Sequence, residues 1–316
     1  MKTSYSVCGF LSGGVLAAVV ASASLAMAQA PAHVDAVDAG RLFGDACAPC
    51  HGNLGDGSGA PRLGTPQPRD FTAGVFKFRS TPTGSLPTDE DLFRTISRGV
   101  PGTWMPAWEE MLTPAQRWAL VAYIKQFSEY FAEEEPDPPV DISPAPDRSS
   151  ALVQEGRFVY AMLGCAQCHG TVGRGDGPSA SDLEDDWGQQ IWPYDFTRGN
   201  YKAGSNPTDI YRTLVTGLSG SPMPAFERGM VAYAGGADGD VATARDIYND
   251  ETIRELEAYL SGQPTQSALG AMADTEVDRL VRDRLWALVY YVRSLDRGRG
   301  LFYRLFRENP DFQEKR

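Results

Sequence analysis

The feature that most restricts the fold of this chain is an internal duplication built around two short cysteine and histidine motifs. The segment Cys-Ala-Pro-Cys-His-Gly at 47–52 is repeated as Cys-Ala-Gln-Cys-His-Gly at 165–170. Five further blocks match in the same order, and the last pairs 117–121 with 285–289. Six blocks in one order indicate a duplicated domain. A chain of 316 residues is also long enough for two domains of roughly 150 residues each.

The blocks between these two ends keep a common spacing. They are Gly55-Asp56-Gly57 with Gly175-Asp176-Gly177, Asp70-Phe71-Thr72 with Asp195-Phe196-Thr197, Pro87-Thr88-Asp89 with Pro207-Thr208-Asp209, and Met105-Pro106-Ala107 with Met223-Pro224-Ala225. Met105 follows His51 by 54 residues (105 minus 51), and Met223 follows His169 by 54 residues (223 minus 169). The two copies therefore have equal length from the histidine to the methionine.

The repeat predicts two domains, at 38–130 and 150–296. The segment 131–149 between them is acidic and rich in proline, a composition that stays extended because it buries too little apolar surface to fold alone. We interpret it as an interdomain linker, and we treat residues 297–316 as a C-terminal tail.

The second copy carries an insertion. Its final tryptophan lies 63 residues after Met223 (286 minus 223), whereas Trp118 lies 13 residues after Met105 (118 minus 105). The difference places about 50 extra residues at about 227–276. Within them, 249–260 is expected to form a helix capped by Asn249 or Asp250.

The rest of the chain is predicted to be mainly helical. Residues 39–50 and 151–168 place apolar side chains at helical spacing before each cysteine pair. Thr113-Pro114 is typical of a helix start, with a capping residue followed by proline at the first position. Segments rich in glycine and proline connect the helices, and no convincing alternating strand is found.

The N-terminus resembles an export signal. Residues 9–26 contain no charged side chain, and Ala26-Met27-Ala28 is typical of a cleavage site, so residues 1–28 are predicted to be a secretory signal peptide. An uncleaved membrane anchor is the alternative. We expect a periplasmic protein that meets the membrane only through a partner or an uncleaved N-terminus. The net charge of -12 disfavours binding to nucleic acid.

The two cysteine motifs are the candidate functional sites. Cysteines three residues apart lie about one helical turn from each other, so both sulfurs can bond one edge of a haem while the next histidine faces the iron. The predicted thioether anchors and proximal ligands are Cys47, Cys50 and His51 in the first copy, and Cys165, Cys168 and His169 in the second. A thioredoxin-like redox pair or a structural zinc site is the alternative, although the motif lacks a βαβ context.

A methionine at the same place in each copy supplies a candidate second iron ligand. Met105 and Met223 each precede a proline in a loop rich in glycine and proline, which biases the methionine toward extended backbone. A thioether suits haem iron, but packing in the core or on the surface is the commoner fate of methionine. Met111 and Met230 are fallback candidates. The chain has three histidines, and His33 is the one outside the motifs, so two haems with paired histidines are excluded within the chain.

With these features the chain resembles a tandem of class I cytochrome c domains. The resemblance rests on Cys-x-x-Cys-His after a helix, on the methionine loop, and on a final helix with an aromatic face. It covers roughly 38–128 and 150–295. It implies two helical domains, each wrapped around one covalently bound haem c, with the first and last helices of each domain in contact. Arg98 and Arg212 are candidates for pairing with haem propionates, although ordinary surface positions are equally consistent with the sequence.

The expected function is electron transfer between a redox donor and an acceptor, such as another cytochrome, a periplasmic dehydrogenase or an oxidase. The protein would act as a free shuttle or as the cytochrome subunit of a larger complex. The alternative is a haem enzyme of the dihaem peroxidase or thiosulfate dehydrogenase type. Such an enzyme needs an exchangeable iron position, for which we expect extra histidines or a free cysteine beside the haem.

Overall fold

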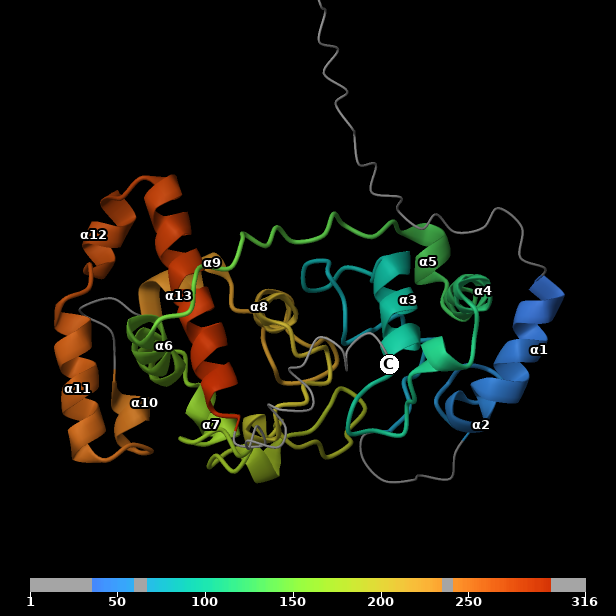
Figure 1. The fold of residues 1–316 in the computed structure, drawn as a ribbon, viewed down its shortest axis with the longest axis horizontal. Coiled ribbons are helices and arrows are strands. Elements are labelled where there is room, and N and C mark those ends of the chain that lie inside the picture. The colour runs from blue at the N-terminus through green and yellow to red at the C-terminus, as the bar shows by residue number, and fades with distance from the viewer. Residues whose placement is uncertain (1–35, 60–66, 235–240, 297–316) are drawn as a thin grey trace, which may run out of the picture.

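The computed structural model describes residues 36–59, 67–234 and 241–296, which form two helical domains side by side (Figure 1). Over these ranges the structure consists of helices and loops, with a single isolated β-bridge between Glu184 and Gln190. The mainly helical fold is thus confirmed. None of the helices in these ranges has the length and hydropathy needed to cross a bilayer. The predicted signal peptide and C-terminal tail lie outside the described residues.

The first domain is organised around two crossing helices, α1 and α4. Its elements are α1 (Ala36–Ala46), α2 (Ala48–His51), α3 (Asp89–Arg98), the 3-10 turn η1 (Trp108–Glu110), α4 (Pro114–Lys125) and α5 (Tyr130–Glu133). Helix α4 packs against both α1 and α3. Phe43 of α1 and Leu120 and Val121 of α4 are almost completely buried in the shared core. Thr113 caps α4 as predicted, since its side chain accepts a hydrogen bond from the Gln116 backbone N–H.

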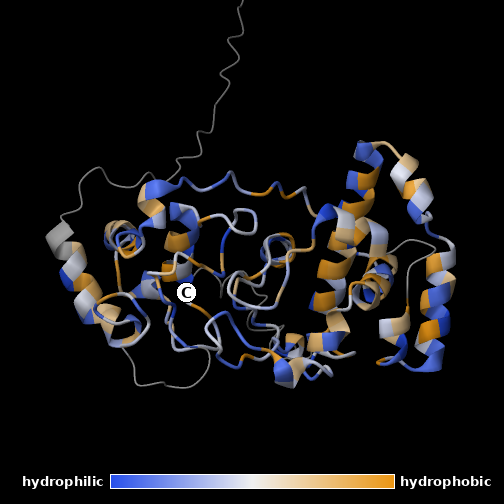
Figure 2. Ribbon diagram, turned by 180° about the vertical axis from the view of Figure 1, so that it is seen from behind, coloured by the Kyte–Doolittle hydropathy of each residue, from blue (hydrophilic) through white to orange (hydrophobic). Residues whose placement is uncertain are grey.

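The second domain repeats this arrangement with longer helices. Its corresponding elements are α6 (Ser150–Met162), α7 (Cys165–His169), the 3-10 turns η2 (Ala180–Asp182) and η3 (Phe196–Arg198), α8 (Pro207–Thr216) and α13 (Asp274–Ser294). Helices α6 and α13 pack closely, because a side-chain carbon at Gly156 would lie only 2.0 Å from the Ala287 carbonyl oxygen. Figure 2 shows hydrophobic residues along the length of α13, and buried side chains run from Val277 to Val292. The first and last helices of both domains are therefore in contact, as the resemblance implied.

The insertion in the second domain forms four helices around α6 and α13. They are α9 (Arg228–Ala234), α10 (Ala242–Arg245), α11 (Asp250–Ser261) and α12 (Gln266–Ala271) (Figure 1). The helix predicted at 249–260 is confirmed, and Asn249 caps it by accepting a hydrogen bond from the Thr252 N–H at 2.9 Å. Helix α11 buries Ile253 and Leu256 in a small core that also holds Ala161 of α6.

The helices before the cysteine motifs end earlier than the sequence predicts. The periodicity over 39–50 and 151–168 suggested helices that reach the second cysteine, but α1 ends at Ala46 and α6 ends at Met162. In the second domain the chain passes through Gly164, whose φ of 68° is left-handed, before α7 begins. A left-handed residue breaks the helical hydrogen-bond ladder. Each cysteine motif therefore occupies a short helix of its own.

Side chains of the first domain fasten the C-terminal end of α8 in the second. Arg79 Nη2 and Thr83 Oγ1 both donate hydrogen bonds to the Thr216 carbonyl, at 2.6 and 3.0 Å. A cation at a helix C-terminus also interacts favourably with the helix dipole. The guanidinium of Arg69 lies over the Trp187 ring at 4.5 Å from its centroid. These contacts hold the two domains against each other.

The predicted linker is extended, but it is bonded to both domains. Residues 134–149 contain neither helix nor strand and run along one side of the molecule in Figure 1. The Val140 N–H donates to the Ser80 carbonyl at 2.8 Å in the first domain. In the second domain, Tyr290 donates its hydroxyl proton to the Pro146 carbonyl at 2.6 Å. The linker therefore contributes to the contact between domains.

Candidate functional sites

The first cysteine motif occupies one helical turn. The N–H groups of Cys50 and His51 both donate to the Cys47 carbonyl, at 3.0 and 2.9 Å. Cys47 and Cys50 are not joined by a disulfide, and both are half-buried. The turn thus places two free thiols and an imidazole on one short segment, as the spacing predicts.

The ring of His51 is oriented by a backbone carbonyl and a phenylalanine. Its Nδ1 lies 3.0 Å from the Arg69 carbonyl oxygen. Since a carbonyl can only accept, Nδ1 carries the proton, and Nε2 remains available as a ligand. Phe71 stacks on the imidazole, with ring centroids 4.5 Å apart and planes 19° from parallel. A histidine held in this way is a preorganised metal ligand.

The second motif reproduces this geometry closely. His169 Nδ1 lies 3.0 Å from the Tyr194 carbonyl oxygen, and Phe196 stacks on the ring at 4.3 Å and 19°. Cys165 and Cys168 lie on the short helix α7, again without a disulfide. Burial lowers the pKa of His51 and of His169, which favours the neutral imidazole that binds metals. The agreement extends to features that no sequence pattern encodes.

The environment of the thiols is unlike that of a redox-active cysteine pair. Burial raises the pKa of Cys47 to about 11 and that of Cys165 to about 12, with smaller contributions from Cys50 and Cys168. A reactive thiol requires the opposite shift, because the thiolate is the nucleophile. Over the ranges that the structure describes, no three His, Cys, Asp or Glu side chains gather as a structural zinc ion requires. The geometry favours buried thiols that bond an apolar cofactor.

The methionine loops have the same backbone form in both domains. The Val100 N–H donates to the Met105 carbonyl at 3.0 Å, and the Leu218 N–H donates to the Met223 carbonyl at 3.1 Å. Met105 and Met223 are half-buried, whereas the fallback candidates Met111 and Met230 are 58% and 45% exposed. The burial favours the first pair as inward-facing side chains.

A glycine after α3 and another after α8 allow these loops to approach the helices. Gly99 and Gly217 have φ of 63° and 61°. A side-chain carbon would lie 2.4 Å from the Pro106 carbonyl carbon at the first position, and 2.6 Å from the Ala225 backbone nitrogen at the second. No other residue type combines this left-handed backbone with such close packing. The glycines therefore fix where each methionine loop runs.

The predicted propionate partners have a carboxylate of their own. Arg212 Nη1 lies 2.7 Å from Asp209 Oδ1, and Arg98 Nη1 lies 3.6 Å from Asp209 Oδ2. The sequence analysis missed the Arg69 and Tyr194 carbonyls and the stacking role of Phe71 and Phe196. The matched Asp-Phe-Thr blocks were the available signal.

The residues present fit a haem held by thioether bonds in each domain. Both sites combine two thiols on one turn, an imidazole with Nε2 available, and aromatic packing around the imidazole. A haem iron is commonly bound by a proximal histidine, and a Cys-x-x-Cys-His segment is the usual attachment sequence for haem c. The chemistry of the donor set thus matches this cofactor in both copies.

Comparison with known proteins supports the same conclusion. The family model described as cytochrome c matches residues 36–128 and 153–296. No curated protein matches the chain. A solved structure described as "Kuenenia stuttgartiensis reducing HAO-like protein complex Kustc0457/Kustc0458" contains a chain that is 38% identical, with a TM-score of 0.65. The match covers 85% of this chain and 99% of that one. The chain therefore belongs to the cytochrome c family and consists of two cytochrome c domains in tandem.

Proposed function

We propose that the protein is a dihaem c-type cytochrome that passes single electrons between a donor oxidoreductase and a downstream acceptor outside the cytoplasm. The observation that carries this proposal is the duplicated histidine geometry. In both domains the proximal imidazole has the same hydrogen bond of 3.0 Å to a backbone carbonyl and the same stacking angle of 19°. Two equally built ligands are what two equivalent redox centres require.

The proposed ligand set follows from these positions. Cys47, Cys50, Cys165 and Cys168 form the thioether bonds, and His51 and His169 bind iron through Nε2. Met105 and Met223 provide the opposite ligands, supported by their equal spacing from the histidines and by their half-buried loops. A bound haem supplies an iron that changes its charge by one electron, and methionine ligation raises its reduction potential.

The protein residues keep this centre closed and rigid. A packed core and a fixed imidazole reduce the movement that accompanies a change of charge, because the ligands are held by contacts that do not depend on the iron. Phe71 supports this on one side of His51, since it also packs against Phe43 and Phe76 in the core. The methionine loop, fixed by Gly99, occupies the position that a substrate would need. These features favour electron transfer over substrate chemistry.

The partner is proposed to be a redox enzyme or another cytochrome. The similar chain belongs to a solved complex whose name pairs two proteins, Kustc0457 and Kustc0458. This supports a role as the cytochrome subunit of a larger oxidoreductase complex, and a free shuttle is the other form of the same function. Affinity purification of the tagged protein from native membranes and periplasm separates the two, because a subunit elutes with a stoichiometric partner and a shuttle elutes alone.

Export is proposed from the predicted signal peptide at residues 1–28, since haem attachment to such motifs and a periplasmic partner both require it. N-terminal sequencing of the purified protein tests the proposal. A mature chain that begins at Gln29 supports export with cleavage after Ala28. An intact chain in the cytoplasmic fraction contradicts it.

The ligand set is tested by mass and by the optical spectrum of the ferric protein. Two covalent haems should be present, and the red charge-transfer band of methionine-bound ferric haem should fall by about half in Met105→Ala and again in Met223→Ala. Met111→Ala is the matched control, because this methionine is exposed, and it should leave the band unchanged. A protein without covalent haem, or one without the band before any substitution, contradicts the proposal. Rapid turnover of peroxide or thiosulfate by the unaltered protein would instead indicate the enzyme alternative.

A further inference from the structure

The boundary between the two domains holds a group of cations that the proposed function has not yet used. Arg69 and Lys77 come from the first domain, and Lys202 comes from the second. We call these three residues the interdomain cation cluster. The protein as a whole has a net charge of -12, so a concentration of positive charge at an internal boundary runs against its overall balance. Such a local excess calls for an anionic partner.

The charge of Lys77 is poorly compensated by the protein. The pKa of Lys77 is lowered to about 8, first by burial and then by the nearby positive charge of Arg69. Lys202 adds to this shift, while Asp185 and Asp186 oppose it without reversing it. Burying an ammonium group without a close counterion is costly. A partner of opposite charge at this place would remove the cost.

Lys202 is in the same condition. Burial lowers its pKa as well. Among the residues that the structure describes, neither lysine forms an ion pair with a carboxylate, whereas Lys125 lies 2.7 Å from Asp89 Oδ1. Arg94 and Arg212 are also paired, with Asp91 and Asp209. The unpaired lysines are thus the two at the domain boundary.

The two lysines occupy equivalent positions relative to their proximal histidines. Lys77 lies eight residues after Arg69, whose carbonyl orients His51 (77 minus 69). Lys202 lies eight residues after Tyr194, whose carbonyl orients His169 (202 minus 194). Each lysine therefore ends a segment that starts beside its own cofactor site. The packing of the domains then brings the ends of both segments together.

A cavity of about 140 Å³ lies at this boundary and is lined by both domains. Arg94 and Arg98 line it from the first domain, and Lys202 and Ser205 line it from the second. Every ionisable side chain in its lining is therefore a cation. The cavity provides a polar, positively charged space between the two cofactor sites.

This inference rests on the proposed haem function. We infer that carboxylate groups of both haems are held by the interdomain cation cluster, so that a single set of cations from two domains binds the acidic edges of both cofactors. The two propionates of a haem are its only charged substituents, and the cluster supplies cations that lack a protein counterion. Because Lys77 and Lys202 are close enough to affect each other, the haems share this charge. A change at one lysine must then be felt at both haems.

The experiment measures the reduction potentials of both haems by optical titration of the holoprotein, for the unaltered chain and for Lys77→Met and Lys202→Met. Removing a cation favours the more positive, oxidised iron, so each variant should lower the potential of the haem in its own domain. We expect about a tenfold change in the redox equilibrium, which is about 59 mV for a one-electron couple. The potential of the other haem should fall by a smaller factor. Met105→Ala and Met223→Ala identify which transition belongs to which haem.

Three comparisons make the result decisive. Lys125→Met removes a lysine that is already paired, and it should leave both potentials unchanged. Lys77→Arg keeps the charge and should restore the potentials that Lys77→Met lowers, which a purely structural role would not require. Inorganic phosphate added at constant ionic strength should have no effect on the unaltered protein, because the cluster is occupied by the haems.

Different failures are distinguishable. If the purified protein carries no covalent haem, the proposed function fails together with this inference. If both haems are present and the lysine variants behave like Lys125→Met, only the inference is overturned. A shift confined to the haem of the altered domain contradicts sharing, and potentials that follow the phosphate concentration show that the cluster binds a free anion instead.

Discussion

The two domains agree where they face the cofactor sites and differ elsewhere. The histidine hydrogen bond, the stacked phenylalanine and the glycine before each methionine loop are repeated with nearly identical geometry. By contrast, the final helix has 12 residues in the first domain and 21 in the second, and four inserted helices surround the second. The comparison teaches that a short set of local contacts specifies the site, while many different cores can support it.

A buried arginine on the final helix illustrates how the cores diverged. In the first domain Arg117 donates a hydrogen bond to Ser97 Oγ of α3. The repeat aligns Arg117 with Leu285 and Ser97 with Val215, so the second domain has two apolar residues in place of this polar pair. Its buried arginine is Arg284, one position earlier, which faces the insertion instead. A shift of one residue turns a side chain by about 100° around a helix.

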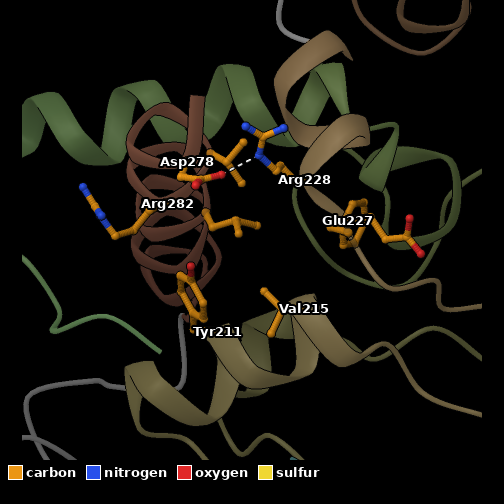
Figure 3. Close-up of a pocket in the computed structure, with 9 residues that line it drawn as sticks. Tyr211, Val215, Glu227, Arg228, Asp278 and Arg282 are labelled. Carbon is orange, nitrogen blue, oxygen red and sulfur yellow. Dashed lines mark hydrogen bonds and ion pairs between the residues drawn. The ribbon is translucent and has the colours of Figure 1, made fainter. Parts of the chain in front are cut away.

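The exchange leaves a cavity in the second domain. It has a volume of about 310 Å³, and both Val215 and Leu285 line it. Figure 3 shows Tyr211 at one side of this cavity, and Arg228 of α9 bonded to Asp278 of α13 at another. The insertion thus closes the second domain with ion pairs at a place where the first domain is filled by larger side chains.

The largest effect is expected from Arg284→Leu. Arg284 is completely buried and donates hydrogen bonds to the carbonyls of Val231 and Ala232 at 3.0 and 2.9 Å, and to Gln263 Oε1 at 3.0 Å. Leucine leaves three buried acceptors without this donor, which should lower the free energy of unfolding of the second domain by about 3–5 kcal/mol. Urea denaturation measures the loss. Arg282→Leu, on the exposed side of the same helix, should change stability by less than about 0.5 kcal/mol, and equal effects of both would contradict the assignment.

A smaller loss is expected from Gly156→Ala, which tests the close crossing of α6 and α13. The new methyl group would lie 2.0 Å from the Ala287 carbonyl oxygen, so the helices must separate. Overpacking of this kind costs about 1–3 kcal/mol. In the first domain Gly44→Ala is the matched change, since a side-chain carbon there has no neighbour within 4 Å. It should stabilise α1 by up to about 1 kcal/mol, and calorimetry should show shifts of opposite sign for the two variants.

The third prediction transfers the apolar pair of the second domain into the first. Arg117→Leu removes a hydrogen bond to Ser97 and a stacking contact with Phe93, whose ring centroid lies 4.7 Å from the guanidinium carbon. The expected cost is about 1–2 kcal/mol. Adding Ser97→Val should recover about 1 kcal/mol, because replacing both polar partners by apolar groups is close to neutral. A double-mutant cycle measures this coupling, and additive effects would show that the two positions do not act as a pair.

Sequence alone gave the cysteine turns, the capped start of α4, the inserted helix at 249–260 and the equal spacing of the methionines, because each depends on contacts between near neighbours in the chain. It missed the Arg69 and Tyr194 carbonyls, since every residue has a carbonyl and only the fold selects which one meets a histidine. It also assigned Arg98 and Arg212 to propionates, although Asp209 lies beside both. The matched lysines at 77 and 202 were visible, but their convergence depends on how the domains pack.

The smallest effect is expected at the start of the final helices, where the domains differ by a single capping side chain. Thr113 in the first domain accepts a hydrogen bond from the Gln116 N–H at 3.3 Å, and Gln116 Oε1 accepts from the Thr113 N–H at 2.9 Å. In the second domain Ala273 stands at the cap and has no side-chain oxygen, although Glu276 still accepts from its N–H at 3.3 Å. Half of this reciprocal pair is therefore present already.

Ala273→Thr should complete the cap of α13 and raise the free energy of unfolding of the second domain by about 0.5–1 kcal/mol, because one unpaired helical N–H gains an acceptor. The reciprocal change Thr113→Ala should lower the stability of the first domain by about 1 kcal/mol. Thermal denaturation of both variants measures the difference. If Ala273→Thr has no effect while Thr113→Ala does, the start of α13 is held by its contacts with the insertion and not by its cap, and the two final helices begin for different physical reasons.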